Sequence, residues 1–381
     1  MNKKTIVIAA ITIISVSAVY SAEQDAAEAA LIKGLDFLMS KQETDGHFSD
    51  AKTPALTALP LWASAECAKK GIKSSKYDEA EIAAKRENAA KFVLAAQNED
   101  GGFYAKMMPR PPKDGKKPPK DMNGSGGPGG LSTYNTAVCL SALFEFGKAP
   151  TEPLLKARKF LAESQLDGDD TMAGGFGYGQ TRGPRRYADL SNTAYALDAM
   201  RRTEGLEEFR KDGKKVDVNW DKAIAFVENL QEKEGPAKGG AAYNERTAQA
   251  GTATNATGRV KLMAYGSMSY AAVMSMAHAK LSKGDPRVRN AMAYCEKYWT
   301  VEENPGMGTQ GLFYYYDILS RALSAAAVDK VGDHEWKKEL AAQLVKLQKP
   351  DGSWYNENNR FWEADPVLCT SFAVICLSLC R

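Results

Sequence analysis

Acidic side chains are the groups in this sequence best suited to move a proton. Four of them stand at or near the beginning of an apolar segment: Asp189, Asp317, Glu363 and Asp365. A carboxyl group that is shielded from water, or close to a second carboxyl group, has a raised pKa and can serve as a general acid or base. If the protein is an enzyme, Asp189 and Asp365 are the catalytic candidates.

Aromatic and polar side chains recur at the same places along the chain and are candidates for contacting a ligand. Aromatic walls that carry a few polar groups are typical of ligand pockets. The same side chains could instead fill the core of the fold, where tyrosine hydroxyls would need partners. The ligand-binding candidates are Tyr134, Asn135, Tyr187, Asn192, Tyr265, Tyr270, Tyr315, Tyr316, Asp317 and Trp362.

The sequence lacks the residue patterns of metal sites, paired cysteines and nucleophilic catalysis. The three histidines, His47, His278 and His334, show no zinc-binding spacing, so we predict neither a metal site nor a cofactor. The six cysteines form no CxxC pair, and most lie in apolar helical stretches, where a free cysteine behaves as a small buried hydrophobe. No strand is evident, and neither a nucleophile elbow nor a Gly-rich loop after a strand is present.

A repeat runs through the chain and must position these residues. Each unit has an amphipathic helix that ends in Gln, a Gly-containing turn with an aromatic residue, and a second helix rich in small residues. The gap between Gln231 and Gln348 is about two periods long, and residues 285–316 supply a degenerate copy, which makes six units. The repeat glutamines are Gln42, Gln97, Gln165, Gln231 and Gln348.

The helix patterns predict two concentric rings. The second helix of each unit is apolar on nearly all faces, which indicates burial, whereas the first carries charge on one face. Each hairpin must therefore stack on its neighbours. The last helix, which ends FAVICLSLC, has no polar capping repeat after it, and this favours closure. We predict an all-α fold, an α/α toroid (α6/α6 barrel) of six helical hairpins. The Gln amide should tie each helix end to the next unit, while the Gly adopts a positive φ.

Two insertions interrupt the repeat. Residues 105–130 are rich in proline and basic residues, a composition that favours polyproline II structure or disorder. Residues 235–259 are rich in Gly, Ala and Thr and lie between the two helices of the fourth unit. Such loops are either functional lids or tolerated surface insertions. The basic loop is either a dock for an acidic polymer or, as we favour, a solvated charge run.

Composition and the N-terminal residues indicate where the protein is located and which partners it does not bind. The 381-residue chain has 50 basic and 47 acidic residues, a net charge of +3, which gives no global field for binding nucleic acid. Residues 1–22 have two lysines, an apolar run and small residues, the pattern of a signal peptide. We expect a secreted or periplasmic protein, with residues 23–381 as one toroid domain and no transmembrane span after cleavage.

The repeat resembles that of the terpenoid cyclase and protein prenyltransferase superfamily, which includes the squalene cyclases. Its most specific copy is Gln348–Trp354 (QKPDGSW), and Gln97–Phe103 (QNEDGGF) is also good. The resemblance covers nearly all of the mature chain. It implies an α/α toroid whose inner helices surround a central cavity. Repeat resemblance is strong evidence for a fold and weak evidence for a reaction.

The sequence departs from this superfamily at the residues that do chemistry. Cyclases that protonate an alkene carry an Asp-x-Asp-Asp-Thr-Ala motif, and Asp189–Ala194 (DLSNTA) has Ser191 in place of the proton donor and Asn192 in place of the last Asp. The zinc ligands of the prenyltransferases are also missing. Tyr265 and Ser267 stand for the Asp and Cys, and Cys369 for the His.

Three functions remain open. The first is an exported cyclase-like protein without the acid, which binds an extended isoprenoid, peptide or glycan in an aromatic central cavity. The second is an active enzyme, either a terpenoid cyclase-like isomerase with a displaced acid (Asp189 or Asp365) or a glycan-acting toroid with a carboxylate pair. The third is an extracellular scaffold whose outer ring binds protein partners. Export favours the first function or the glycan version, because polyprenyl substrates are made on the cytoplasmic side.

Overall fold

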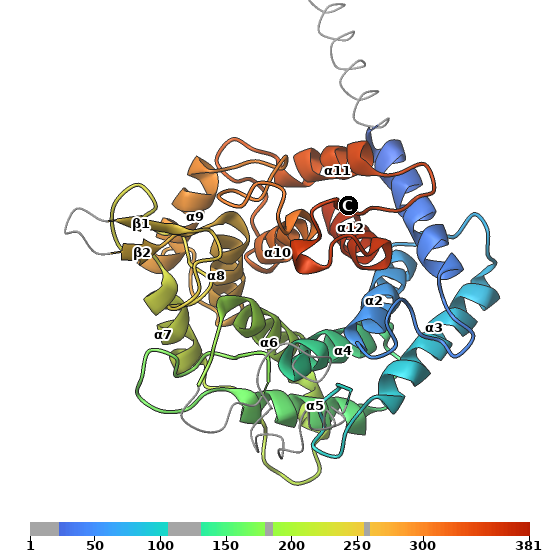
Figure 1. Ribbon diagram of the computed structural model, residues 1–381. Coiled ribbons are helices and arrows are strands. Elements are labelled where there is room, and N and C mark those ends of the chain that lie inside the picture. The colour runs from blue at the N-terminus through green and yellow to red at the C-terminus, as the bar shows by residue number, and fades with distance from the viewer. Residues whose placement is uncertain (1–22, 106–130, 180–185, 255–259) are drawn as a thin grey trace, which may run out of the picture.

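The computed structural model describes residues 23–105, 131–179, 186–254 and 260–381. Within these residues, twelve α-helices alternate between an outer and an inner ring (Figure 1). The predicted all-α toroid of six hairpins is therefore confirmed. The predicted signal peptide, residues 1–22, and nearly all of the insertion at 105–130 lie outside the described residues.

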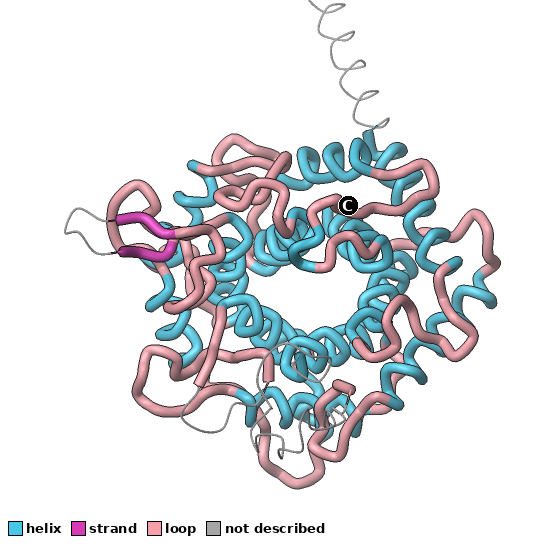
Figure 2. Tube along the Cα trace, viewed as in Figure 1, coloured by secondary structure: helices cyan, strands magenta, loops and turns pink. Residues whose placement is uncertain are grey.

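The two rings follow the order of the repeat (Figure 2). The outer helices are α1 (residues 23–40), α3 (Glu79–Ala95), α5 (Thr151–Ser164), α7 (Trp220–Leu230), α9 (Pro286–Lys297) and α11 (Trp336–Leu347). The inner helices are α2 (Ala55–Lys69), α4 (Ser132–Phe146), α6 (Leu190–Arg202), α8 (Gly266–His278), α10 (Leu312–Ala325) and α12 (Pro366–Cys380). Each inner helix packs against the next, and α12 packs against α2, so the inner ring is closed.

Burial explains why the apolar helices lie inside. Helix α12 is buried from Val367 to Ser378, whereas α3 buries only Ile82, Ala89, Ala90 and Val93. Burying one Leu or Phe side chain contributes about 1.5–3 kcal/mol, so a helix that is apolar all round belongs in the inner ring. The six cysteines are unpaired, and all except Cys380 are buried.

The repeat glutamines join neighbouring hairpins as predicted. The Gln348 Nε2 donates to the Gly352 carbonyl in its own turn, at 3.1 Å, and to the Ala30 carbonyl in α1, at 2.9 Å. This contact closes the outer ring between the last unit and the first. The equivalent second acceptors for Gln42, Gln97, Gln165 and Gln231 are the carbonyls of Lys85, Pro153, Asn219 and Arg287.

The turn after each glutamine depends on glycine and on a helix hydroxyl. Gly352 has a φ of +90°, and a Cβ there would lie 2.5 Å from the Lys33 carbonyl oxygen, so a side chain is excluded. Two residues later, the Trp354 N–H donates to Thr370 Oγ1 on α12, at 3.0 Å. The same contact joins Phe48 to Thr57, Phe103 to Thr136, Phe176 to Thr193, and Ala241 to Ser269. The repeat pattern in the sequence does not predict this hydroxyl contact.

One local expectation is wrong. The insertion at 235–259 contains β1 (Thr252–Thr254), which pairs antiparallel with β2 (Val260–Leu262), although no strand was evident in the sequence. Strands of three residues are too short to show an alternating pattern. A helix with the length and apolar character needed to cross a membrane is absent from the described part of the chain.

Candidate functional site

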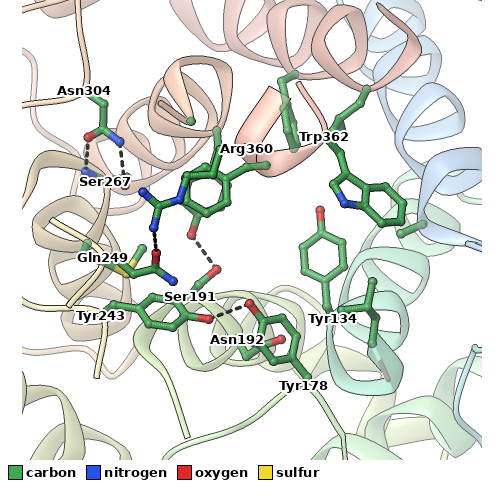
Figure 3. A pocket seen from close by; sticks show the side chains of 18 of the residues that line it. Tyr134, Tyr178, Ser191, Asn192, Tyr243, Gln249, Ser267, Asn304, Arg360 and Trp362 are labelled. Atoms are coloured by element: carbon green, nitrogen blue, oxygen red, sulfur yellow. Dashed lines mark hydrogen bonds between the residues drawn. The ribbon is translucent and has the colours of Figure 1, made fainter. Parts of the chain in front are cut away.

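A cavity of about 370 Å³ opens at the end of the toroid where the inner helices begin (Figure 3). Residues from the starts of all six inner helices and from the adjoining turns line it. They are Thr53, Ala55, Leu56, Leu131, Tyr134, Tyr178, Ser191, Asn192, Tyr243, Gln249, Tyr265, Ser267, Met268, Asn304, Gly311, Tyr314, Arg360, Phe361, Trp362, Leu368 and Phe372. This volume is in the range of small-molecule sites.

The cavity has two unlike sides. On the side formed by α12, α2 and α4, apolar residues predominate: Ala55, Leu56, Leu131, Leu368 and Phe372. On the side formed by α6, α8, α10 and their turns, hydroxyl and amide groups predominate: Tyr178, Ser191, Asn192, Tyr243, Tyr265, Ser267, Asn304 and Tyr314. No carboxylate of the described residues lines the cavity.

The polar side is held by contacts between its own members. The Tyr314 hydroxyl donates to Ser191 Oγ at 2.7 Å, which joins α10 to α6. The hydroxyls of Tyr178 and Tyr243 are also 2.7 Å apart. In a hydroxyl pair one group accepts, and the accepting group keeps its own proton to donate. This side therefore offers both donors and acceptors to a ligand.

Asp189 lies behind this polar side. It is fully buried, caps α6, and accepts from the Asn192 backbone N–H at 2.8 Å and from Asn192 Nδ2 at 2.7 Å. Burial raises the pKa of Asp189 to about 7, against the opposing hydrogen bonds from Asn192 and Tyr243. Asp189 is not a lining residue, and the residues between it and the cavity are Asn192 and Tyr243, which both line the cavity.

Asp365 and Glu363 are also helix-terminal acids. Asp365 caps α12, accepts from the Val367 N–H at 2.8 Å and is hydrogen-bonded by the Ser49 hydroxyl. Glu363 is buried and accepts from the Tyr314 N–H, at 2.8 Å, at the start of α10. Burial raises the pKa of Glu363 to about 7. Neither acid lines the cavity, so their contacts are those of capping residues.

Of the ten ligand-binding candidates, four line the cavity: Tyr134, Asn192, Tyr265 and Trp362. The start of α10 shows why others do not. Tyr314 points into the cavity, whereas Tyr315 and Tyr316 donate to the carbonyls of Thr300 and Val301, at 2.8 and 2.5 Å. Successive residues on a helix face different directions, so only one of the three tyrosines reaches the axis.

The remaining candidates lie in the surrounding protein. Tyr187 stacks on Tyr178, with ring centroids 6.0 Å apart, and Tyr270 packs against Tyr315 at 5.8 Å. The amide of Asn135 is buried on α4 without a hydrogen-bond partner in the described part of the chain.

Asp317 belongs to a buried ion network farther along α10. It accepts from the Tyr195 hydroxyl at 2.8 Å and from Arg321 at 3.0 Å. Arg321 also pairs with Asp198 on α6, and its guanidinium lies 4.8 Å from the ring centroid of Trp62. The network fills the toroid beyond the cavity, and Tyr195 connects the two by packing edge-on against Tyr134 at 5.0 Å.

Sequence reasoning missed lining residues that lie in turns. Tyr178 and Tyr243 follow the Gly-containing turns of the third and fourth units, and Gln249 lies in the insertion at 235–259. Arg360 and Phe361 lie in the short 3₁₀ helix η4 (Asn359–Phe361). The extra aromatic residue after each repeat turn was a usable signal for Tyr178 and Tyr243, but nothing in the sequence pointed to Arg360.

Comparison with solved structures identifies the architecture. A solved structure of a variant of the type II terpene cyclase MstE from Scytonema, in complex with merosterolic acid A, matches this chain with a TM-score of 0.56 and 13% identity; the match covers 94% of this chain and 98% of the other. The chain has a terpenoid cyclase-like fold. A second MstE variant, in complex with geranylgeranyl dihydroxybenzoate, matches with a TM-score of 0.54, and apo MstE with 0.53, both at 13% identity. The match to this second variant covers 94% of this chain and 98% of the other, and the match to apo MstE covers 93% of this chain and 98% of the other.

Sequence comparison adds nothing to this likeness, since neither a family model nor a curated protein matches the chain. At 13% identity the likeness to MstE extends to the fold alone. The chemistry of this terpenoid cyclase-like toroid has to be argued from its own cavity.

Proposed function

We propose that this protein is an exported, terpenoid cyclase-like toroid that binds an extended apolar ligand in its central cavity and does not start a cyclisation by protonating an alkene. One observation carries the proposal. The position that corresponds to the proton donor is Ser191, which lines the cavity under the hydroxyl of Tyr314, and no carboxylate of the described residues lines the cavity.

The remaining hydroxyls are too weakly acidic for that step. A carbon–carbon double bond is a very weak base, and a tyrosine hydroxyl has an ordinary pKa of about 10. Burial raises the pKa of Tyr314 and of Tyr265 further still. The cavity can therefore orient a ligand by hydrogen bonds, but none of its described lining residues has a group able to protonate an alkene.

The apolar side of the cavity supports an isoprenoid ligand over a peptide or a glycan. A glycan would place hydroxyl groups against the side chains of Leu56, Leu368 and Phe372, where they would lose hydrogen bonds to water. MstE, whose fold this chain shares, binds geranylgeranyl dihydroxybenzoate, a compound with an isoprenoid chain.

A second candidate function rests on Asp189. A carboxyl group with a pKa near 7 suits a general acid or base at neutral pH, and Tyr243 and Tyr178 form a hydrogen-bonded path from Asp189 to the cavity. Such a path could move a proton to or from a hydroxyl or carbonyl group of a ligand. It does not supply the strong acid that an alkene requires.

Native mass spectrometry of the purified protein with squalene, farnesyl diphosphate, geranylgeraniol and a glycan panel tests the proposal. We expect an isoprenoid to bind and its mass and retention time to stay unchanged. A rearranged product would contradict the absence of cyclisation, and binding of glycans alone would overturn the ligand class. Leu56→Trp should fill the cavity and abolish binding, whereas Leu347→Trp, on the outer helix α11, should not.

Export is a separate part of the proposal. It rests on the lysines, apolar run and small residues of residues 1–22. Expressing the full chain in a Gram-negative host, fractionating the cells and measuring the mass of the product tests it. We expect a periplasmic form that has lost about 21 or 22 residues. An uncleaved chain in the cytoplasm would contradict this part without affecting the cavity.

A further inference from the structure

A guanidinium group lies at the mouth of the cavity (Figure 3). Arg360 is exposed and lines the cavity, and among the described lining residues it alone carries a formal charge. Its Nη1 donates to Gln310 Oε1 at 2.5 Å and its Nη2 to Gln249 Oε1 at 2.7 Å. These two amides come from different units of the toroid and fix the guanidinium from two sides.

The partners of Arg360 hold it without neutralising it. Other arginines that are held from two sides have carboxylate partners: Arg158 pairs with Glu207, Arg287 with Asp285 and Glu228, and Arg321 with Asp198 and Asp317. An amide oxygen accepts a hydrogen bond but carries no charge. Two acids lie three residues from Arg360 in the sequence, Glu357 and Glu363. Glu363 is occupied by the start of α10 and by Asn356, and Arg360 makes its side-chain hydrogen bonds in the described part of the chain to Gln310 and Gln249 instead of to Glu357. The positive charge of Arg360 is left for another partner.

The donors of Arg360 are also incompletely used. A guanidinium has five N–H donors in a planar fork. The two contacts to Gln249 and Gln310 use two of them, which leaves three for solvent or for a ligand. A planar fork with free N–H groups matches a carboxylate, which can accept two parallel hydrogen bonds.

The residues that follow Arg360 place apolar surface beside this charge. The guanidinium carbon of Arg360 lies over the ring of Phe361, 5.3 Å from the ring centroid. Phe361 is 38% exposed. Trp362 has a backbone φ of +65°, and 54% of its surface is exposed. Both Phe361 and Trp362 line the cavity, so part of their exposed surface faces it. A positive φ is costly for a bulky residue, and exposed aromatic surface is costly in water. A positive charge and exposed apolar surface are therefore adjacent at the cavity mouth. This arrangement suits an amphiphilic ligand, which has a charged group next to an apolar body.

We infer that the ligand is an apolar carboxylic acid, whose carboxylate pairs with Arg360 at the cavity mouth while its apolar body lies along the side formed by α12, α2 and α4. This inference rests on the proposed function and adds the class and the orientation of the ligand. One guanidinium matches one negative charge. A phosphate monoester, which carries about two negative charges, would keep one of them unpaired among the described lining residues.

Isothermal titration of the mature protein with geranylgeranoic acid, geranylgeraniol and geranylgeranyl phosphate tests the inference. We expect the acid to bind most tightly. Arg360→Gln should weaken the binding of the acid about tenfold, the effect of one hydrogen bond to a charged group, and change that of the alcohol less than about twofold. Arg360→Lys, which keeps the charge but lacks the fork, should restore part of the affinity.

A matched control is available in the outer ring. Arg289 is exposed on α9, away from the cavity, so Arg289→Gln removes the same charge and should leave all three affinities unchanged. Equal affinities for acid and alcohol, tightest binding of the phosphate, or the same loss in both variants would overturn the inference. Absence of binding by all three compounds would instead count against the proposed function.

Discussion

Helix α6 carries two buried aspartates whose pKa values shift in opposite directions. Burial raises the pKa of Asp189, at the start of the helix, to about 7 because its partners are neutral. Burial also opposes ionisation of Asp198, nine residues later, but Arg202 and Arg321 bring its pKa well below the ordinary value. The toroid therefore has a hollow end lined by hydroxyl and amide groups, with Arg360 as the charged residue among the described lining residues, and an interior held by ion pairs. The hollow end is where a ligand has room.

Removing Arg321 should have the largest effect. Arg321→Met leaves Asp198 and Asp317 buried without their shared cation, and we expect a loss of about 3–5 kcal/mol in the free energy of unfolding. Urea denaturation measures this loss. Arg289→Met, a change of the same type on the outer surface, should stay within about 0.5 kcal/mol. An equal and small effect in both variants would show that the ion network does not hold the interior.

The opposite pKa shifts predict a pH dependence. Asp189 and Glu363 have folded-state pKa values of about 7, above the ordinary values of 3.8 and 4.5, so these two groups bind more protons in the folded state than in the unfolded state between about pH 4 and 7. Their contribution to stability is present at pH 4 and is lost as the pH rises through 7. Asp189→Asn should reduce the loss of stability between pH 5 and 7 by about 1–3 kcal/mol, as followed by thermal melting at each pH.

Asp198→Asn is the informative contrast to that measurement. Because the pKa of Asp198 is already low, this substitution should lower stability without flattening the profile between pH 5 and 7. A profile that is unchanged by Asp189→Asn would show that Asp189 is ionised throughout this range, and the contrast between the two aspartates would be lost.

The glutamine that closes the ring should matter less than the ion network. Gln348→Ala removes the hydrogen bonds to Gly352 and Ala30, and we expect a loss of about 1–2 kcal/mol, measured by urea denaturation. Gln97→Ala removes the same pair of contacts between the second and third units. Since five of the six units make this contact with the same geometry, the two losses should be similar. A much larger loss for Gln97→Ala would mean that the join between the last unit and the first is weaker than the others.

The smallest expected effect concerns the polar side of the cavity. Tyr314→Phe removes the hydrogen bond to Ser191 and should cost about 0.5–1.5 kcal/mol in stability while weakening ligand binding only slightly. Tyr315→Phe removes a bond of similar length to the Thr300 carbonyl, between the rings, and should leave ligand binding unchanged. Comparing the two by denaturation and titration separates the cavity from its surroundings. Stronger impairment of binding by Tyr315→Phe would contradict the assignment of the lining.

The sequence predicted the architecture because the repeat recurs along the chain, with its key glutamine in five of the six units. Glutamine, glycine and aromatic residues recur with the same roles, and Gln348 reaches Ala30 as ring closure requires. The lining was predicted only in part, because a helix start does not show which of Tyr314, Tyr315 and Tyr316 faces the axis. The sequence makes Asp189 and Asp365 catalytic candidates, and the structure shows both as helix caps, a role that fits the same sequence position.

Residues in turns were the least predictable. Arg360 and Gln249 are 111 residues apart in the sequence and meet only because the ring brings the last unit against the insertion of the fourth. No periodic pattern encodes such a contact, since it depends on how two irregular segments fold over the cavity. Periodicity predicts regular elements, and the irregular connections determine what the cavity mouth presents.

A crystal structure of the mature protein with geranylgeranoic acid tests the central claim most directly. We expect an unaltered, extended ligand between the two sides of the cavity, with its carboxylate on the guanidinium of Arg360. A cavity that holds no ligand at saturating concentration, or one that holds a cyclised product, would contradict it.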